Sequence, residues 1–286
     1  MSETPTPSNK LSAGKAVPSK SGKLLVERNG PITTVTLNRP ECHNALDREI
    51  SAELNAVVRE IKYDRACRIV VFTGAGNTFC AGDDIKEMPE FKSGEGGDGP
   101  WLIRMYQETV NSVENLVPIT IAMVDGVCTG GGLELTLACD FVIATDRSRW
   151  GMPEINWGIT PGWGGCSRLA KFAGRRKTKE WNLLGALFTG KEAQEYDLVN
   201  RLTTPERLLR DTEDLVGAML EKNAMALWCT KHFLNAGAES SVEIGLAFEA
   251  APPRTTSLGR PTGIYDFATK EGRTKRSSLP NAIWKD

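Results

Sequence analysis

The sequence predicts an α/β protein. Three stretches rich in β-branched residues, at 32–37, 68–73 and 119–124, have the length and apolar character of buried strands. Between them lie segments with the periodicity of amphipathic helices, at about 44–61 and 101–117. Because strands that alternate with helices tend to pair in parallel, we expect an α/β core with parallel strand pairing.

The N-terminal part of the chain changes character at about residue 23. Residues 1–22 are rich in Ser, Pro, Thr and Lys and contain no apolar block, so we predict a disordered lead without a secretory signal. Two strands then follow at 24–27 and 32–37, on either side of Asn29-Gly30. An Asn-Gly pair between two such strands is typical of a β-hairpin.

Composition argues against several classes of function. The 286 residues carry a net charge of −1, with 25% charged and 40% hydrophobic residues, as in ordinary globular proteins and unlike a dedicated nucleic-acid binder. With only two histidines, His43 and His232, we expect neither a metal site nor a serine triad. The seven irregularly spaced cysteines predict reduced, buried thiols in a cytoplasmic protein. No apolar run is long enough to span a membrane, so no membrane association is expected.

Two turns of small residues each precede a predicted helix in the middle of the chain. At 78–88 the sequence TFCAGDDIKEM runs from a turn into a short helix, and Gly130-Gly131-Gly132 precedes a helix that starts at Leu133. Backbone N–H groups at a helix N-terminus lack intrahelical partners and carry the positive end of the helix dipole. Without side chains in the way, such groups can bind the oxygen of a polarised carbonyl.

Two carboxylates accompany the triple glycine. Glu134 lies in the first turn of the predicted helix, where the dipole favours its ionised form, and Glu154 follows twenty positions later, directly after Pro153. Two carboxylates near one reacting group can divide the work of general acid and general base. The simpler alternative is that the glycines only permit close packing and that Glu134 caps its helix.

The second half of the chain is predicted to be largely helical. After a strand at 141–145, the segments beyond Gly165 have helical periodicity throughout. We therefore divide the chain after the lead into an α/β core at 23–200 and a helical C-terminal region at 201–286. Residues 89–99 contain four glycines and several charges, which predict a flexible surface segment.

Three motifs together resemble those of the enoyl-CoA hydratase/isomerase (crotonase) family. They are FCAGDDIKEM at 79–88, GGGLE at 130–134 and PEINWGITPGWGG at 153–165, and they occur in the family's order and spacing. The resemblance covers about residues 23–275. It implies a crotonase-like core of repeated ββα units with two roughly perpendicular sheets, followed by a helical C-terminal trimerisation region. A homotrimer or a dimer of trimers is the assembly it implies.

The resemblance also implies the site. The backbone N–H groups of Asp83 and Gly131 would form an oxyanion hole, and Glu134 and Glu154 would be the catalytic carboxylates. Asp83 departs from the small or apolar residue common at its position and places a negative charge near that hole. The implied contacts to substrate and CoA are His43, Ala45, Leu46, Ala81, Asp84, Ile85, Gly130, Gly162, Phe267 and Lys270.

Two of the implied CoA contacts concern the nucleotide end of the ligand. Cys42 stands where family members often carry a lysine, so phosphate contacts would come from His43, Arg39 or elsewhere. Phe267 and Lys270, three positions apart, match a family stretch that contacts the CoA of a neighbouring subunit. The simpler alternatives are that His43 only packs and that the Phe-Lys pair belongs to an ordinary surface helix.

The retained pair of carboxylates favours reversible hydration of a 2-enoyl-CoA thioester, a hydro-lyase reaction that needs no cofactor because coenzyme A is part of the substrate. A double-bond isomerase can work with one carboxylate, so an isomerase, hydratase-lyase or hydrolase acting on an aromatic or cyclic acyl-CoA remains an alternative. Trp157 and Trp163 flank Glu154, and EINWG also occurs in relatives resembling hydroxycinnamoyl-CoA hydratase-lyases. Both tryptophans could equally be part of the core. A non-catalytic protein of this fold would normally have lost a carboxylate or the glycine turn.

Overall fold

The computed structural model describes the following parts of the 286-residue chain: residues 10–11, 14–87 and 99–250. Phe267, Lys270 and nearly all of the predicted flexible segment lie outside the described residues. The chain divides into two compact units, residues 1–213 and 214–286, and each is considered by itself.

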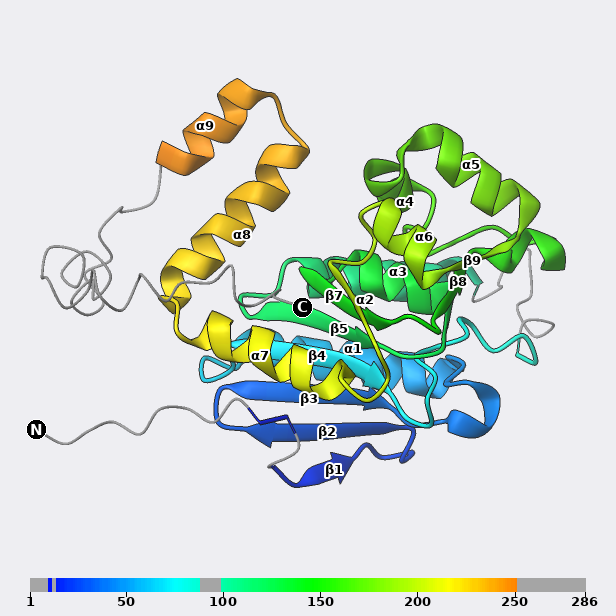
Figure 1. The fold of residues 1–286 in the computed structure, drawn as a ribbon, viewed down its shortest axis with the longest axis horizontal. Coiled ribbons are helices and arrows are strands. Elements are labelled where there is room, and N and C mark those ends of the chain that lie inside the picture. The colour runs from blue at the N-terminus through cyan, green and yellow to red at the C-terminus, as the bar shows by residue number, and fades with distance from the viewer. Residues whose placement is uncertain (1–9, 12–13, 88–98, 251–286) are drawn as a thin grey trace, which may run out of the picture. The chain divides into compact units, whose positions relative to one another are not determined.

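A seven-stranded sheet forms the frame of the first unit (Figure 1). Its strands lie in the order β1-β2-β3-β4-β5-β7-β10. The pairs β1–β2 and β2–β3 are antiparallel, whereas every pair from β3 onward is parallel, which confirms the predicted α/β fold with parallel pairing. The strands are Ala16–Pro18 (β1), Leu24–Asn29 (β2), Ile32–Leu37 (β3), Ile69–Gly74 (β4), Ile119–Val124 (β5), Phe141–Thr145 (β7) and Arg201–Thr203 (β10).

The predicted hairpin joins β2 to β3. Asn29 pairs with Ile32, so Gly30 and Pro31 form a two-residue loop. Gly30 has a φ of 56°, a conformation that glycine adopts without steric cost. The first strand extends to Asn29, beyond the predicted end at residue 27, because its pairing with β3 continues to the loop.

The lead is not disordered throughout. β1 lies within it and pairs antiparallel with β2 at the edge of the sheet, although its three side chains are exposed. The prediction of disorder across residues 1–22 is therefore wrong for β1. Composition did not reveal this strand because pairing at a sheet edge uses backbone groups and needs no apolar side chains.

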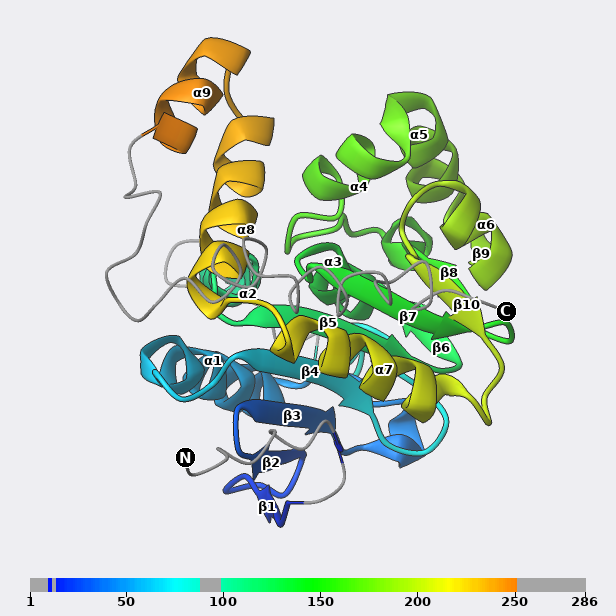
Figure 2. The same cartoon turned by 60° about the vertical axis from the view of Figure 1, so that its left-hand side comes forward.

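A second, three-stranded sheet lies beside α3 and α6 (Figure 2). It consists of β6 (Val127–Thr129), β8 (Arg149–Gly151) and β9 (Leu187–Thr189), with β6 parallel and β9 antiparallel to β8. β9 and β10 contradict the prediction that the chain beyond Gly165 is helical throughout, and β10 extends the α/β core past its predicted end at residue 200. Strands of three residues are too short for periodicity to reveal.

The helices follow the predicted order, with shifted ends, except that the short helix predicted within 78–88 is only a turn at 85–87 in the described residues. α1 begins at Arg48 rather than at Asn44, because Asp47 caps it by accepting a hydrogen bond of 2.9 Å from the amide of Ile50. The helices are Arg48–Tyr63 (α1), Gly99–Glu114 (α2), Gly131–Leu137 (α3), Ser167–Phe172 (α4), Gly174–Leu184 (α5), Gly190–Glu195 (α6), Leu208–Leu220 (α7), Ala224–Ala238 (α8) and Val242–Ala250 (α9), with short 3-10 helices at Pro40–Cys42 (η1) and Pro153–Trp157 (η3).

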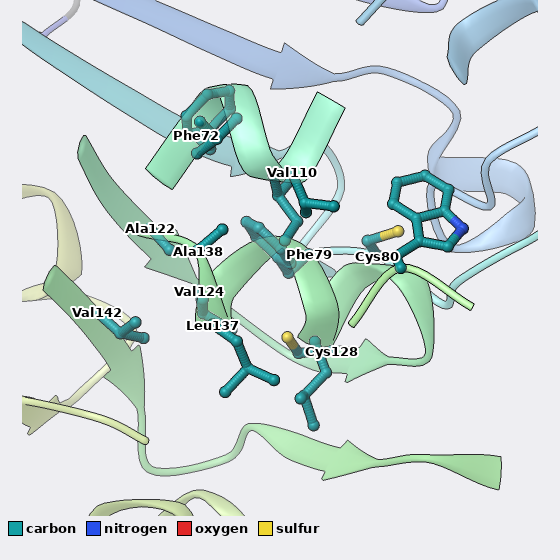
Figure 3. Packing of buried hydrophobic residues seen from close by; sticks show 14 of the residues in the cluster. Phe72, Phe79, Cys80, Val110, Ala122, Val124, Cys128, Leu137, Ala138 and Val142 are labelled. Carbon is teal, nitrogen blue, oxygen red and sulfur yellow. The ribbon is translucent and has the colours of Figure 1, made fainter. Parts of the chain in front are cut away.

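The hydrophobic core of the first unit is built from the large sheet and helices α1, α2 and α3. Figure 3 shows side chains from β4, β5 and β7, among them Phe72, Val124 and Val142, gathered with Leu137 and Ala138 at the end of α3. All seven residues of α3 are buried. A helix buried on every side is held rigidly by its surroundings, and it therefore fixes the position of any polar group that it carries.

The described part of the second unit is helical, as the sequence predicts. α8 and α9 pack against each other. Large apolar side chains remain exposed on the two helices: Leu234, Val242, Ile244, Leu246 and Phe248. Packing of this region between subunits stays a prediction.

None of the seven cysteines, all of which lie in the described residues, forms a disulfide, and three of them, Cys67, Cys80 and Cys128, are buried. Cys166 is exposed, so the predicted burial holds for only part of the set. Within residues 10–11, 14–87 and 99–250, no helix is both long and apolar enough to cross a membrane.

Candidate active site

The triple glycine forms the entry to α3. Gly130 is the N-cap and has a φ of 51°, which favours glycine. A Cβ on Gly132 would lie 2.6 Å from the carbonyl oxygen of Cys80, so no larger residue fits there. The amides of Gly131 and Gly132 follow at the helix N-terminus, where intrahelical acceptors are lacking. The glycines therefore serve close packing and, at the same time, supply backbone donors that have no intrahelical acceptor.

The loop that carries Asp83 runs beside the segment that precedes α1. Leu46 and Asp83 form an isolated parallel bridge, in which the Leu46 amide donates to Gly82 O at 2.8 Å and the Asp84 amide donates to Leu46 O at 2.9 Å. These bonds use the peptide groups on either side of Asp83. Because the C=O and N–H of one trans peptide group point in opposite directions, and Gly82 O points at Leu46, the amide of Asp83 in the same peptide group points away from Leu46.

The Asp83 loop and the glycine turn lie against each other. The Thr129 amide donates to Cys80 O at 2.9 Å and ties the two segments together. A Cβ on Gly82 would lie 3.2 Å from the amide nitrogen of Gly131, so the two chains approach as closely as glycine permits. The structure thus brings Asp83 and Gly131, which are 48 positions apart in the sequence, to one place.

Glu134 is buried in the first turn of α3, with 1% of its surface exposed. Its Oε1 accepts hydrogen bonds from the amides of Trp163 at 2.8 Å and Gly165 at 2.6 Å. Burial raises the pKa of Glu134 to about 8, the Gly165 amide acts against this rise, and the charge of Glu154 adds to it. The reading of Glu134 as only a cap is wrong, because its carboxyl binds amides of a distant loop.

Glu154 lies in η3, on the other side of the glycine turn. One of its oxygens, Oε1, would lie 3.2 Å from a Cβ on Gly130. Its Oε2 is buried and has no hydrogen-bond partner within the described part of the chain. Burial raises the pKa of Glu154 above its ordinary value. A carboxyl oxygen that is buried without a partner is poised to bind a proton or a ligand.

The side chain of Asp83 is a third carboxyl at the same turn. Its Oδ1 would lie 3.5 Å from a Cβ on Gly131. Burial, and then the charge of Glu154, raise the pKa of Asp83 to about 7, while the indole N–H of Trp163 acts against the rise. The concern that Asp83 adds a fixed negative charge is therefore reduced, because three mutually repelling carboxyls do not all stay ionised near neutral pH.

The predicted CoA-binding residues divide into two groups. His43 has the left-handed conformation, with a φ of 54°, and its carbonyl accepts a hydrogen bond from Ala81. Leu46 is buried, and its Cδ1 would lie 3.4 Å from a Cβ on Gly131. Ile85 is exposed. The residues that lie on the Asp83 loop, the segment before α1 or the glycine turn are His43, Ala45, Leu46, Ala81, Asp84, Ile85 and Gly130. Gly162 lies on the loop whose Trp163 and Gly165 amides bind Glu134, and its carbonyl accepts a hydrogen bond from Gln107.

Arg39 and Asn44 have structural roles that the sequence did not reveal. Arg39 donates to Ala45 O at 2.5 Å and pairs with Asp84 at 3.1 Å, so it braces the site from within rather than reaching toward a phosphate. The buried amide of Asn44 donates to the carbonyls of Ala75, Thr78 and Phe79. Neither role has a signal in periodicity or spacing, because both depend on loops that meet only in the fold.

The two tryptophans near Glu154 differ. Trp163 is buried and stacks on Tyr106, with ring centroids 4.5 Å apart, whereas Trp157 is 60% exposed. The alternative that both tryptophans belong to the core therefore holds only for Trp163. Tyr106, on α2, is a neighbour of the site that the sequence placed only on an apolar helix face.

This arrangement defines a class of site. Two adjacent backbone donors beside buried carboxyls can polarise a carbonyl and exchange protons with the atoms next to it. A sequence profile of the enoyl-CoA hydratase/isomerase family matches residues 27–271. The chain belongs to this family, as its three motifs predict.

Comparison with individual proteins agrees with this assignment. The short-chain-enoyl-CoA hydratase of Clostridium acetobutylicum is 33% identical over 228 residues, which are 79% of this chain and 86% of that protein. The hydroxycinnamoyl-CoA hydratase-lyase of Pseudomonas fluorescens is 36% identical over 221 residues, which are 73% and 76%. A Thermobifida fusca structure in complex with acetoacetyl-CoA has a TM-score of 0.73 at 27% identity and covers 79% of this chain and 91% of that one. The fold predicted from the motifs is thus confirmed.

Proposed function

We propose that this protein is an enoyl-CoA hydratase, a hydro-lyase that adds water reversibly to the double bond of a 2-enoyl-CoA thioester. The observation that carries the proposal is the meeting of the Asp83 loop with the glycine turn, which are flanked by Glu134 and Glu154. Relatives named as enoyl-CoA hydratases, at about one-third identity, support the same reaction. The CoA complex of the Thermobifida fusca structure supports an acyl-CoA substrate.

The thioester oxygen of the substrate would lie between the amides of Asp83 and Gly131. Two hydrogen bonds to this oxygen draw electrons from the conjugated double bond and stabilise the enolate that forms when a nucleophile attacks Cβ. Both donors are backbone groups of tightly packed loops, so they need little reorganisation as charge develops. No further cofactor is required for this chemistry.

Glu134 and Glu154 would divide the proton transfers. One carboxylate takes a proton from the water that attacks Cβ, and the other delivers a proton to Cα. Repulsion between the two charges favours a state in which one is ionised and one is protonated, and burial raises the pKa of both. The pair therefore contains both an ionised carboxylate that can accept the proton of water and a protonated carboxyl that can donate a proton to Cα.

A hydratase-lyase is the second candidate. It is supported by the hydroxycinnamoyl-CoA hydratase-lyase relative and by the exposed Trp157, which ends the short helix η3 that carries Glu154. Such an enzyme would also add water but would then cleave the acyl chain. A double-bond isomerase or a thioester hydrolase would leave no hydration product at all.

Assembly and location are further parts of the proposal. A trimer or a dimer of trimers is supported by the large apolar side chains exposed on α8 and α9. The cytoplasm is the proposed compartment, supported by seven cysteines that the structure describes without a disulfide. Neither nucleic acid nor a membrane is a proposed partner.

A panel of enoyl-CoA thioesters with short, long, branched and aromatic acyl groups tests the reaction. Hydration removes the conjugated absorbance and yields a 3-hydroxyacyl-CoA, whereas a lyase yields an aldehyde, an isomerase moves the double bond and a hydrolase releases free CoA. We expect the 3-hydroxyacyl-CoA, and we expect Glu154→Gln to lower kcat about 100- to 10,000-fold. Turnover of no panel member to this product, or full activity of the variant, would refute the assignment.

A further inference from the structure

Two buried polar atoms with opposite hydrogen-bonding character lie unpaired at the glycine turn. They are Oδ1 of Asp83 and Nε1 of Trp163, and neither has a hydrogen-bond partner among the residues that the structure describes. A buried indole N–H or carboxyl oxygen without a partner is unusual, because each loses its hydrogen bonds to water on folding. Their pairing with a ligand would remove this cost.

Both atoms face the same small volume. A Cβ on Gly131 would lie 3.5 Å from Oδ1 of Asp83 and 3.5 Å from Cε2 of Trp163, the ring carbon bonded to Nε1. The indole N–H of Trp163 lies close enough to Asp83 to lower the pKa of its carboxyl. Nε1 of Trp163 and Oδ1 of Asp83 nevertheless form no hydrogen bond of normal geometry with each other. The donor and the acceptor therefore lie next to each other beside one of the two proposed oxyanion donors.

The two side chains are held in place by the rest of the site. Trp163 is 2% exposed, stacks on Tyr106 and donates its backbone amide to Glu134. Asp83 is fixed at its backbone by the bridge to Leu46. Trp163 cannot turn away without losing its stacking on Tyr106, and the backbone of Asp83 cannot move without breaking the bridge to Leu46, so both residues stay at the glycine turn.

A hydroxyl group complements this pair, because its oxygen accepts from the indole N–H while its hydrogen is donated to the carboxyl. We propose that Asp83 and Trp163 form a subsite for a hydroxyl group on the acyl chain of the substrate. This proposal rests on the proposed function, since the acyl chain enters the site through its thioester. A plain alkyl chain would cover both atoms and leave them unpaired.

The position of the hydroxyl follows from the role of Asp83. If the backbone amide of Asp83 binds the thioester oxygen, the carboxyl of the same residue is only a few bonds from that amide. The carboxyl therefore reaches the first few carbons of the acyl chain. A hydroxyl on the fourth carbon is therefore the preferred case.

The test compares 4-hydroxycrotonyl-CoA with crotonyl-CoA in the wild type, Asp83→Ala and Trp163→Phe. We expect the wild type to prefer the hydroxylated substrate in kcat/KM, and each variant to lower this preference about 10- to 100-fold, because each removes one partner of the hydroxyl. Trp163→Phe keeps an aromatic ring against Tyr106. Trp181→Phe is the matched control, since Trp181 stacks on Phe188 elsewhere in the core, and it should leave the preference unchanged.

A binding measurement separates this proposal from the proposed function. Calorimetry of 4-hydroxybutyryl-CoA and butyryl-CoA, which cannot be hydrated, should give the same preference and the same losses even if the wild type hydrates neither enoyl substrate. Equal binding of the two analogues by the wild type would overturn the subsite. Variants that weaken the binding of both analogues equally would also overturn the subsite, because Oδ1 of Asp83 and Nε1 of Trp163 would then bind only water.

Discussion

Replacing Glu134 by Gln is expected to abolish most activity and to stabilise the protein at high pH. The Gln carbonyl can still accept the amides of Trp163 and Gly165, so the loop around them is retained. The variant loses only the ability to bind and release a proton. We expect kcat for crotonyl-CoA hydration to fall about 100- to 10,000-fold, with little change in the affinity for the thioester.

The effect on stability follows from the direction of the pKa change. The pKa of Glu134 rises from 4.5 to about 8 on folding, so the folded state binds the proton more tightly than the unfolded chain. Below pH 4.5 the carboxyl is protonated in both the folded and the unfolded state, so it does not lower the free energy of unfolding. Between pH 4.5 and about 8 the folded state becomes progressively less stable, by up to about 5 kcal/mol in total, because an ionised carboxyl is buried. Gln carries no such cost.

Urea unfolding of the wild type and Glu134→Gln at about pH 5 and about pH 9 measures this difference. The variant should be close to the wild type at the lower pH and several kcal/mol more stable at the higher one. Glu134→Ala is the control for packing and hydrogen bonding, because it leaves two buried amides unpaired at a cost of roughly 1–3 kcal/mol each. A stability difference that does not grow with pH, or wild-type turnover by Glu134→Gln, would refute the reasoning.

The remaining predictions concern packing and capping. Gly132→Ala should lower the free energy of unfolding by about 2–4 kcal/mol in urea titrations, since its Cβ would lie 2.6 Å from Cys80 O. Gly162→Ala is the control. Its Cβ would have no described neighbour nearer than 3.9 Å, so the free energy of unfolding should change by less than about 1 kcal/mol. Equal effects would contradict the close-approach argument. Asp47→Ala should cost about 1–2 kcal/mol at neutral pH by removing the cap of α1. Burial opposes ionisation of Asp47, but the Ile50 amide and Lys23 hold its pKa below the ordinary value. The contribution of Asp47 to the free energy of unfolding should therefore be lost as the pH falls below about 4. A series of unfolding curves at different pH values would show this loss.

Local sequence patterns determined the order of the main elements. The β-branched runs that became β3, β4 and β5, and the Asn-Gly pair of the hairpin, specify strands through short-range preferences that any window of the sequence displays. The three motifs identified the family, because they fix the glycine turn and the two glutamates at constant spacing. β1, β6, β8, β9 and β10 were missed, since three-residue strands depend on a neighbouring strand rather than on their own composition.

Only the tertiary structure decided how the site works. The sequence by itself named Asp83 and Gly131 as amide donors and Glu134 and Glu154 as carboxylates, but it could not place a third carboxyl against an indole N–H. Burial and the distances between loops 48 positions apart arise only when the sheets and helices pack, and burial is the main cause of the raised pKa values of Glu134 and Asp83. Residue type is a property of the chain, whereas the cost of burying a charge belongs to the folded surroundings.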